Sequence, residues 1–335
     1  MKRLFNLIYI YGSLLLMLCV TSCGKNNSNP GAGDVDTYVS GVYRNAAVYW
    51  KNGKLVSVNS SDVGFVGRIA VYGSDVYLPA STFTDTDLYE HAVYWKNGKL
   101  TDLGHGRAES IAVNGNDTYV VGEADENSTF YAACWKNGVL TTYGQLGEIS
   151  QVIVSGNDVY MAGITYNTAG SPIATYWKNN VAVSLGYGQI NSIAVSGNDV
   201  YAVGYGYPNN NNSLCYWKNG QQTVLGDATM TASAIIISGN DFYIAGSVQN
   251  SGTKSTYWKN GVPVTVTSAS KLSGIVVDGN NIYLSGSYSG FGAVSAVTPT
   301  SSLLIENDKV TTLASSTGFS GDYPTYTTWM VGVKR

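Results

Sequence analysis

The sequence is built from one unit that returns about every 41 residues, and this repeat restricts the possible fold more than any other feature. Each unit contains Tyr-Trp-Lys-Asn-Gly or a close variant. The repeated tryptophans are Trp50, Trp95, Trp135, Trp177, Trp217 and Trp258. A second segment keeps the same period, as in IAVSGNDVYAVG at residues 193–204. A period of this length indicates a repeat fold in which each unit buries its apolar side chains against its neighbours.

Each unit has the pattern of two β-hairpins. Two short runs of apolar, β-branched or aromatic residues flank Gly-Asn-Asp at 197–199, and two further runs flank Asn219-Gly220. Asn and Gly tolerate the positive φ angles that two-residue hairpin turns of type I′ require. We therefore predict four strands per unit, named a and b around the Gly-Asn-Asp turn and c and d around the Asn-Gly turn. The Trp on strand c is predicted to fill the space between neighbouring sheets.

Four-stranded units of this length are typical of β-propellers. A seventh c–d hairpin is present at 305–313, with Ile305 in place of Trp. The sequence thus predicts an all-β fold, a seven-bladed β-propeller of four-stranded antiparallel blades. Because the repeat starts on a strand b pattern at 36–43, we expect the ring to be closed by the N- and C-terminal strands. The C-terminal segment aligns with strand a or strand b, and the sequence leaves that choice open.

The first residues predict export. Lys2 and Arg3 precede an apolar run at 4–20, and small residues lead to Cys23, which is the order of a secretory signal. The stretch VTSC at 20–23 resembles a bacterial lipobox, in which the Cys is acylated. We expect a lipoprotein signal peptide at 1–22, lipid attachment at Cys23, a flexible tether at 23–35 and the propeller at 36–335. An uncleaved transmembrane anchor is the alternative.

The residue after the lipobox Cys indicates a location. Gly24 at this position, rather than Asp, resembles lipoproteins that are sorted to an outer membrane. The expected location is therefore the bacterial cell envelope, as an outer-membrane lipoprotein that faces the periplasm or the cell surface. The only membrane contact expected is the lipid anchor.

Composition excludes several kinds of partner and chemistry. Charged residues make up 12% of the chain and its net charge is −3, without the clusters of Lys and Arg that bind nucleic acid. Cys134 and Cys215 are interpreted as small buried apolar residues. His91 and His105 are the only histidines, and no zinc or catalytic-triad motif surrounds them. We expect a monomer with no metal, no cofactor and no nucleic-acid partner.

One whole unit, VYWKNGKLTDLGHGRAESIAVNGNDTYVVGEA at 93–124, resembles the bacterial extracellular repeats called the HAF family. Those repeats run from an aromatic-Trp segment through LTDLG to an apolar segment that ends in Val-Gly. The resemblance implies an exported repeat protein with a propeller-like fold. It implies no established activity, so it assigns no catalytic residue.

The candidate binding residues lie in the loops that vary between units. In a propeller the b–c and d–a loops share one face, and loops free of the repeat pattern are where binding residues concentrate. Aromatic rings cover the apolar faces of sugars, and amide and carboxylate groups meet their hydroxyls. The ligand-binding candidates are Arg107, Glu109, Gln145, Glu148, Tyr187, Gln189, Asn191, Tyr205, Tyr207 and Asp227.

Three hypotheses for function follow. The leading one is a non-enzymatic binding module for a glycan or protein partner, which uses the variable loop face. The second is a carbohydrate-active hydrolase or lyase with Glu109 and Glu148 as an acid and base pair at the channel mouth. The third is a purely structural envelope protein. The Asp residues that recur in the a–b turns and the Lys residues that follow each Trp are interpreted as structural.

Overall fold

A computed structural model describes residues 35–58, 62–83, 89–208, 211–249, 253–289, 300–315 and 326–334. The predicted signal peptide, Cys23 and residues 23–34 of the tether lie outside the described residues. The elements of the described residues are β-strands, which confirms the all-β prediction. None of these residues forms a helix with the length and apolar character needed to span a membrane.

The strands pair antiparallel in sheets. In spatial order, the first sheet is β27 (Tyr326–Lys334), β1 (Val35–Tyr43), β2 (Ala46–Lys51) and β3 (Lys54–Ser57). The second is β11 (Val139–Gln145), β10 (Thr129–Lys136), β9 (Asp117–Glu126), β8 (Lys99–Asn114), β7 (Glu90–Lys96), β6 (Asp75–Phe83) and β4 (Val63–Val66), with β5 (Ala70–Tyr72) also paired to β6. The third is β12 (Glu148–Ser155), β13 (Asp158–Tyr166), β14 (Pro172–Lys178), β15 (Val181–Ser196), β16 (Asp199–Gly206), β17 (Ser213–Lys218) and β18 (Gln221–Asp227). The last two are β19 (Met230–Ser238), β20 (Asp241–Gln249), β21 (Thr253–Lys259) and β22 (Val262–Val266), then β23 (Lys271–Asp278), β24 (Asn281–Ser289), β25 (Thr300–Glu306) and β26 (Lys309–Ser315).

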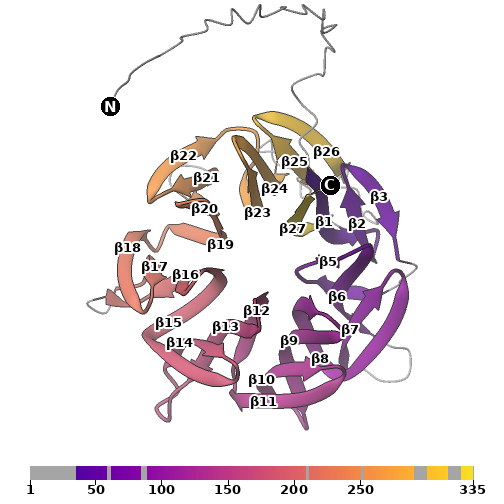
Figure 1. Ribbon diagram of the computed structural model, residues 1–335, viewed down its shortest axis with the longest axis vertical. Coiled ribbons are helices and arrows are strands. Elements are labelled where there is room, and N and C mark those ends of the chain that lie inside the picture. Colours follow the sequence, from indigo (N-terminus) through magenta and orange to yellow (C-terminus); the bar gives the residue numbers. More distant parts are fainter. Residues whose placement is uncertain are drawn as a thin grey trace, which may run out of the picture. The chain divides into compact units, whose positions relative to one another are not determined.

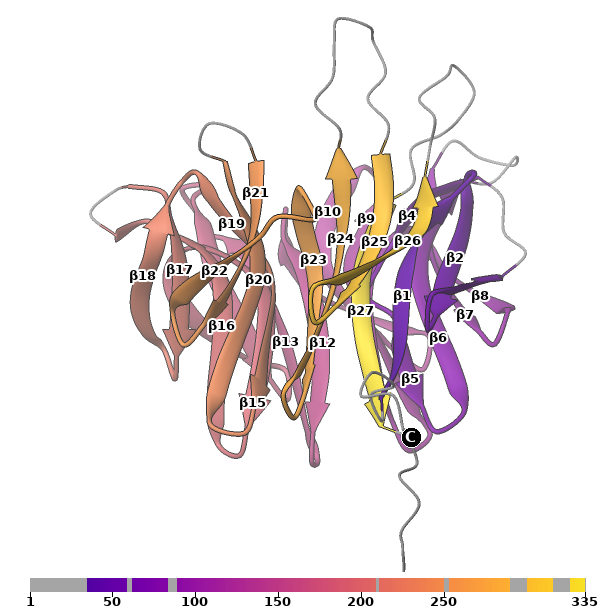
Figure 2. The same cartoon turned by 90° about the horizontal axis from the view of Figure 1, so that it is seen from above.

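Strands β8 and β15 each pass from one predicted repeat unit into the next. The first part of β8 pairs with β7, where Lys99 is opposite Lys96, and the second part pairs with β9, where Gly106 is opposite Ala124. Within the unit Gly33–Arg335, the sheets stand around a central space, and β12, β19, β23 and β27 lie next to it (Figure 1). The strands run along the axis of this space, so that turns and loops collect at its two ends (Figure 2).

The hairpin turns explain why the repeat keeps its Asn and Gly residues. In the c–d turn, Asn219 and Gly220 have φ angles of 51° and 85°, the two positive values of a type I′ turn. The a–b turns differ from the predicted type I′. Gly197 has a φ of 58°, whereas Asn198 is not among the residues with positive φ, which is the type II′ pattern with Gly in the first position.

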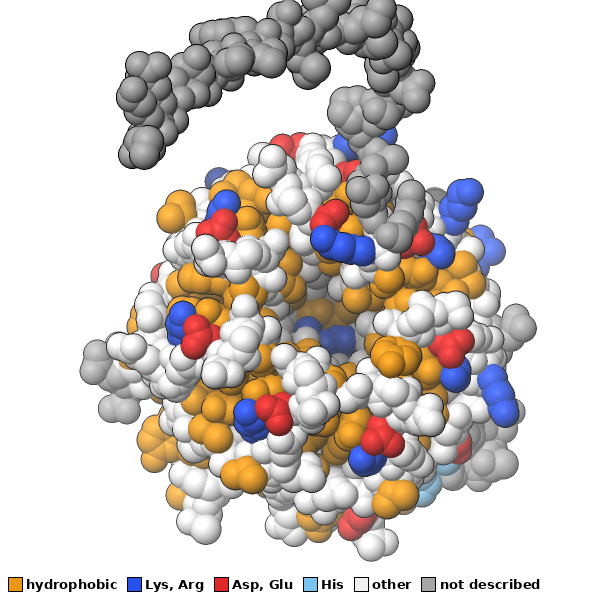
Figure 3. Space-filling view, viewed as in Figure 1, with side chains coloured by type: hydrophobic (Ala, Val, Ile, Leu, Met, Phe, Trp, Pro, Cys, Tyr) orange, Lys and Arg blue, Asp and Glu red, His pale blue; other side chains and the backbone are white. Residues whose placement is uncertain are grey.

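A polar cluster joins the two turns of each unit. Asn219 accepts a hydrogen bond from the Val200 N–H (2.8 Å) and donates one to Asp199 (2.7 Å). The Lys218 ammonium lies 2.9 Å from Asp199 and 5.0 Å from the centre of the Tyr201 ring. The bonds from Asn219 and Lys218 lower the pKa of Asp199. Equivalent Lys–Asp pairs recur at Asp36, Asp75, Asp117, Asp158 and Asp241, and acidic and basic side chains lie side by side around this face (Figure 3).

The repeated tryptophans form the centres of the packing between sheets. Trp50, Trp95, Trp135, Trp177, Trp217 and Trp258 are all at most 3% exposed. Trp177 packs with Val121 and Cys134 of the preceding unit and with Ile149 and Met161 of its own. Burial of these apolar surfaces between neighbouring sheets is the main favourable contribution to folding. Cys134 and Cys215, the cysteines among the described residues, are buried free thiols.

Candidate functional site

The innermost strands carry a β-bulge at the same level. Register shifts fall between residues 108 and 110 of β8, 149 and 151 of β12, 190 and 192 of β15, and 232 and 234 of β19. The residue left out of the pairing in each strand is Glu109, Ser150, Asn191 or Ser233. A bulge leaves such a residue without its ladder partner, so its carbonyl group needs another hydrogen-bond donor.

Arg68 supplies the donor for all four carbonyls, its backbone N–H for that of Glu109 at 2.8 Å and its side chain for the other three. It lies in the break between β4 and β5, and its Nε donates to the carbonyl oxygen of Ser150 at 3.1 Å. Its Nη2 donates to the carbonyl oxygens of Asn191 and Ser233. Burial lowers the pKa of Arg68 to about 9, and the charges of Glu109 and Glu148 oppose this shift. The guanidinium therefore stays protonated at neutral pH.

Trp329, from the C-terminal strand β27, lies against the same guanidinium. The Arg68 Cζ is 3.1 Å from the centre of the Trp329 ring, a cation–π contact. At the position of the innermost strand that corresponds to Arg68, other units have Ser110, Gln151, Ser192, Ala234 and Gly274. Arg68 and Trp329 thus place two large side chains at a level where most units have small ones.

These two side chains line two cavities, one on each side of them. The polar cavity has a volume of about 660 Å³ and the apolar cavity about 510 Å³. The apolar cavity is surrounded mainly by Val, Ile and Ala side chains of the innermost strands. Figure 3 shows the central hollow from the face that carries the Lys–Asp pairs, with basic side chains at depth. The polar cavity contains the groups that can bind a ligand.

One wall of the polar cavity carries a carboxyl pair. Glu109 lies in the bulge of β8, Glu148 begins β12, and the Arg107 Nε lies 2.7 Å from the Glu109 Oε1. Burial, and then the charge of Glu148, raise the pKa of Glu109 to about 8, against the opposing effects of Arg107 and Arg68. Burial also raises the pKa of Glu148. Glu109 is therefore largely protonated at neutral pH.

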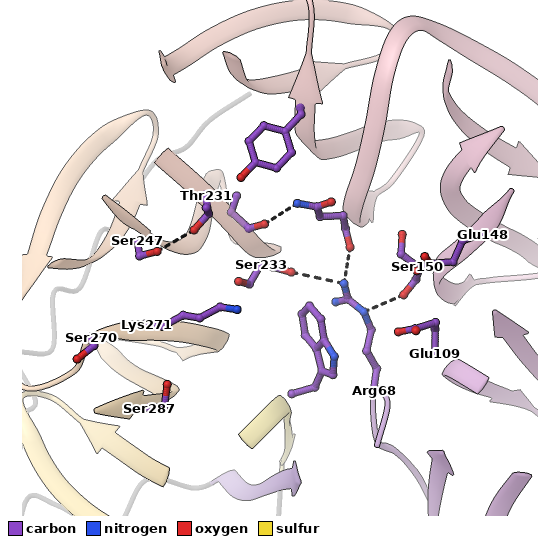
Figure 4. A pocket seen from close by; sticks show the side chains of 14 residues that line it. Arg68, Glu109, Glu148, Ser150, Thr231, Ser233, Ser247, Ser270, Lys271 and Ser287 are labelled. Atoms are coloured by element: carbon purple, nitrogen blue, oxygen red, sulfur yellow. Dashed lines mark hydrogen bonds between the residues drawn. The ribbon is translucent and has the colours of Figure 1, made fainter. Parts of the chain in front are cut away.

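The opposite wall carries hydroxyl groups and a lysine. Lys271, at the start of β23, extends into the cavity from the side facing Glu109 and Glu148 (Figure 4). Thr231 and Ser247 share a hydrogen bond of 2.8 Å between their hydroxyl oxygens. The remaining lining residues are Arg68, Ser150, Asn191, Tyr205, Ala232, Ser233, Ser270, Ser287 and Trp329. The cavity therefore offers carboxyl, hydroxyl, amide and ammonium groups around one volume.

The structure brings together four of the ten ligand-binding candidates. Glu109, Glu148, Asn191 and Tyr205 line the polar cavity. Two more contact its wall, since Arg107 is paired with Glu109, and Gln189 donates to the Asn191 Oδ1 at 2.8 Å.

The other four candidates lie outside this cavity. Gln145 donates to the Tyr131 hydroxyl at 3.2 Å, and Asp227 accepts a bond from the Thr229 N–H at 2.9 Å. Tyr187 and Tyr207 are 57% and 40% exposed. These four residues act locally or face solvent, because the d–a and b–c loops extend outward as well as toward the axis.

The sequence prediction missed Arg68, Lys271 and Trp329. A signal for Lys271 was present, because it occupies the same position of the repeat as Arg107, Glu148 and Gln189, which were selected. A signal for Arg68 was the replacement of Ser by Arg in an otherwise matching segment, RIAV against SIAV.

The described residues contain no group of three or more His, Cys, Asp or Glu side chains that could hold a metal ion. His91 pairs instead with Asp102, with 3.1 Å between the Nδ1 and Oδ2 atoms. The rings of His91 and His105 meet edge to face at 4.9 Å.

No family model matches the chain, and no curated protein matches it. Among solved structures, the β-propeller domain of the Trilobed protease from Pyrococcus furiosus is similar, with 9% identity, 84% of this chain and 95% of that chain covered, and a TM-score of 0.50. A Mycobacterium tuberculosis puromycin-hydrolyzing peptidase has 10% identity and a TM-score of 0.53, with 84% of this chain and 52% of that chain covered. An acylaminoacyl peptidase has 13% identity and a TM-score of 0.49, with 84% of this chain and 51% of that chain covered.

The chain spans about half the length of the two peptidases that it matches. At such identities the similarity shows the fold alone, because unrelated functions share one fold. The fold is a β-propeller.

Proposed function

We propose that the chain is an exported, lipid-anchored β-propeller that binds the end of a glycan chain in the polar cavity and does not cleave it. The proposal includes Cys23 as the lipid attachment site and the outer membrane as the location. If Cys23 is acylated, labelled palmitate will be incorporated into the wild-type chain and not into Cys23→Ser. Incorporation by the variant would contradict this part of the proposal.

The proposed scaffold is a ring of seven four-stranded blades. When β8 and β15 are each divided between two blades, and β4 and β5, which both pair with β6, are counted as one interrupted strand, the strands form seven sets of four. The pairing of β27 with β1 would then close the ring with one strand from each end of the chain. This arrangement places the start of every innermost strand, and hence Glu109, Glu148 and Lys271, around one cavity.

The observation that carries the binding proposal is a cavity lined mainly by polar side chains. Arg68 and Trp329 line it, and its volume of about 660 Å³ is in the range of small-molecule sites, about 300–1,000 Å³. Its carboxyl, amide and hydroxyl groups match the hydroxyls of a sugar, and the Tyr205 ring offers a stacking surface. This size favours the terminal residues of a glycan over a protein surface, which needs a larger contact area.

The carboxyl pair supports a second candidate function, a glycan-cleaving enzyme. A carboxyl group with a pKa near 8 can act as a general acid at neutral pH, and Glu109 has this property. However, Glu109 is held by Arg107 at 2.7 Å and only 13% of its side chain is exposed, which restricts its approach to a glycosidic oxygen. Binding without cleavage is therefore the favoured function.

A binding screen on an oligosaccharide array tests the proposal. We expect the wild-type chain to bind a subset of glycans and Tyr205→Ala to bind them at least tenfold more weakly. Tyr207→Ala, which changes an exposed tyrosine outside the cavity, should bind like the wild type. Absence of binding, or equal binding by both variants, would refute the site. Release of shorter products, lost in Glu148→Gln, would favour the enzyme instead.

A further inference from the structure

The charges around the polar cavity are unevenly distributed. Figure 4 shows Glu109 and Glu148 on one side and Lys271 on the other. Arg68 also lines the cavity, but its Nε and Nη2 atoms are hydrogen-bonded to backbone carbonyls. Arg107 is paired with Glu109. The cavity thus has a basic side and an acidic side, and the arginines near the acidic side are already engaged.

Lys271 is a cation of this cavity whose charged group is not engaged by the chain. Among the residues that the structure describes, none forms a hydrogen bond or an ion pair with its ammonium group. Its neighbours on the same wall are hydroxyl groups, which include Thr231, Ser247 and Ser287. An ammonium group at the wall of a recess binds an anion through charge-assisted hydrogen bonds, and these are stronger than bonds between neutral groups.

We propose that the polar cavity selects an acidic sugar, with the carboxylate of a uronic acid bound to Lys271 and the sugar hydroxyls donating to Glu148 on the opposite wall. This inference rests on the proposed function, because it names the class of glycan that the cavity binds. A uronic acid carries its single carboxylate at one edge of the ring and hydroxyls at the others. The cavity has its ammonium group on one wall and its carboxyl groups on the other, which matches this arrangement of the sugar.

The two competing sugar classes fit less well. A neutral sugar would cover Lys271 without supplying an anion, and a charged group that loses water without gaining a partner weakens binding. An amino sugar would bring an ammonium group into a cavity that already contains Arg68 and Lys271. A charge-assisted bond corresponds to about a ten- to hundredfold preference in binding constant. The expected order is therefore uronic acid, then neutral sugar, then amino sugar.

The test uses three oligosaccharides that differ only in the terminal residue, which is glucuronate, glucose or glucosamine. Binding to the full chain is measured by titration calorimetry at low salt. We expect the wild type to bind the glucuronate form at least tenfold more tightly than the glucose form. Lys271→Gln should lose this preference and bind the glucose form at least as tightly as the wild type does, because no charge is then desolvated, whereas Lys271→Arg should retain the preference. The matched control is Lys99→Gln, a change of an exposed lysine next to a c–d turn on the other face.

The outcomes separate this inference from the function on which it rests. Equal binding of the glucuronate and glucose forms by the wild type would overturn the acidic-sugar proposal and leave glycan binding intact. A preference for glucosamine would also overturn it, since the carboxyl wall would then determine specificity. If none of the oligosaccharides binds, the proposed function fails and this inference fails with it. Thermal unfolding of each variant checks that the fold is retained.

Discussion

Glu109 lies in a β-bulge and has a raised pKa. The bulge in β8 takes Glu109 out of the strand pairing, and its carboxyl is largely shielded from solvent near Glu148, with a pKa of about 8 instead of 4.5. Between these two pH values the folded chain holds the proton and the unfolded chain releases it. The stabilising effect of the neutral carboxyl is complete below pH 4.5 and is lost as the pH rises through about 8.

We therefore predict that the stability of the wild type falls between about pH 5 and pH 8. The contribution of this one group is at most about 1.4 kcal/mol per pH unit. Glu109→Gln, which is neutral at every pH, should show a smaller decrease. The free energy of unfolding is measured by denaturant titration at several pH values, with the exposed Glu126→Gln as the control. An unchanged slope in Glu109→Gln would mean that Glu109 ionises normally in the folded chain.

At the scale of one element, the c–d hairpin depends on its first turn residue. Asn219 adopts a φ of 51° and joins the turn to Val200 and Asp199 of the neighbouring strand through two hydrogen bonds. Alanine in this position would be strained and could make neither side-chain bond. All seven units carry an Asn with positive φ at the equivalent site, including Asn307 in the seventh. The backbone geometry of the turn therefore explains this Asn, without a role in ligand binding.

We predict that Asn219→Ala lowers the free energy of unfolding by about 1–3 kcal/mol. Chemical denaturation followed by circular dichroism measures the loss. Asn198→Ala is the matched control, since Asn198 stands in an a–b turn and is not among the residues with positive φ. Similar losses in the two variants would show that left-handed geometry is not the reason for Asn219.

The repeated tryptophan stabilises the packing between neighbouring sheets. Trp177 is 2% exposed, and the Tyr143 ring of the preceding unit meets its ring edge to face at 5.6 Å between centres. Replacement by alanine would leave a large cavity between two sheets.

We predict that Trp177→Ala costs about 3–5 kcal/mol and reduces the melting temperature. The exposed Tyr187→Ala provides the comparison for loss of an aromatic ring without loss of packing. A melting temperature equal to that of the wild type would contradict the role of Trp177 in packing between sheets.

At the scale of the whole propeller domain, β27 serves two purposes. It pairs with β1 along Val35–Val42, and it supplies Trp329 to the lining of the polar cavity. Without β27 the inner edge of β1 would be unpaired and Arg68 would lose its aromatic partner.

We predict that deletion of 326–335 abolishes cooperative unfolding or leaves the chain aggregated. Trp329→Ala, which keeps the strand, should remain folded and mainly alter the polar cavity. Calorimetry of both variants distinguishes the two roles. Cooperative unfolding of the deleted chain near the wild-type temperature would mean that β27 is not needed to hold the domain together.

The sequence alone determined what repeats. The period, the paired hairpins and the burial of one Trp per unit could be predicted, because each depends on local turn chemistry or on contacts between equivalent strands. Glu109 and Glu148 could be placed at the channel mouth, and Asn191 and Tyr205 on the variable loop face, from their positions in the repeat, and all four line the polar cavity.

Only the tertiary structure decided what does not repeat. Arg68 and Trp329 come from opposite ends of the chain and meet because β27 takes the innermost place beside β1. Three of the bulge carbonyls accept hydrogen bonds from the Arg68 guanidinium. The amino-acid sequence does not indicate these bonds, because every residue has the same backbone carbonyl group. The contents of the central space depend on the simultaneous packing of all the innermost strands, and no single repeat contains that information.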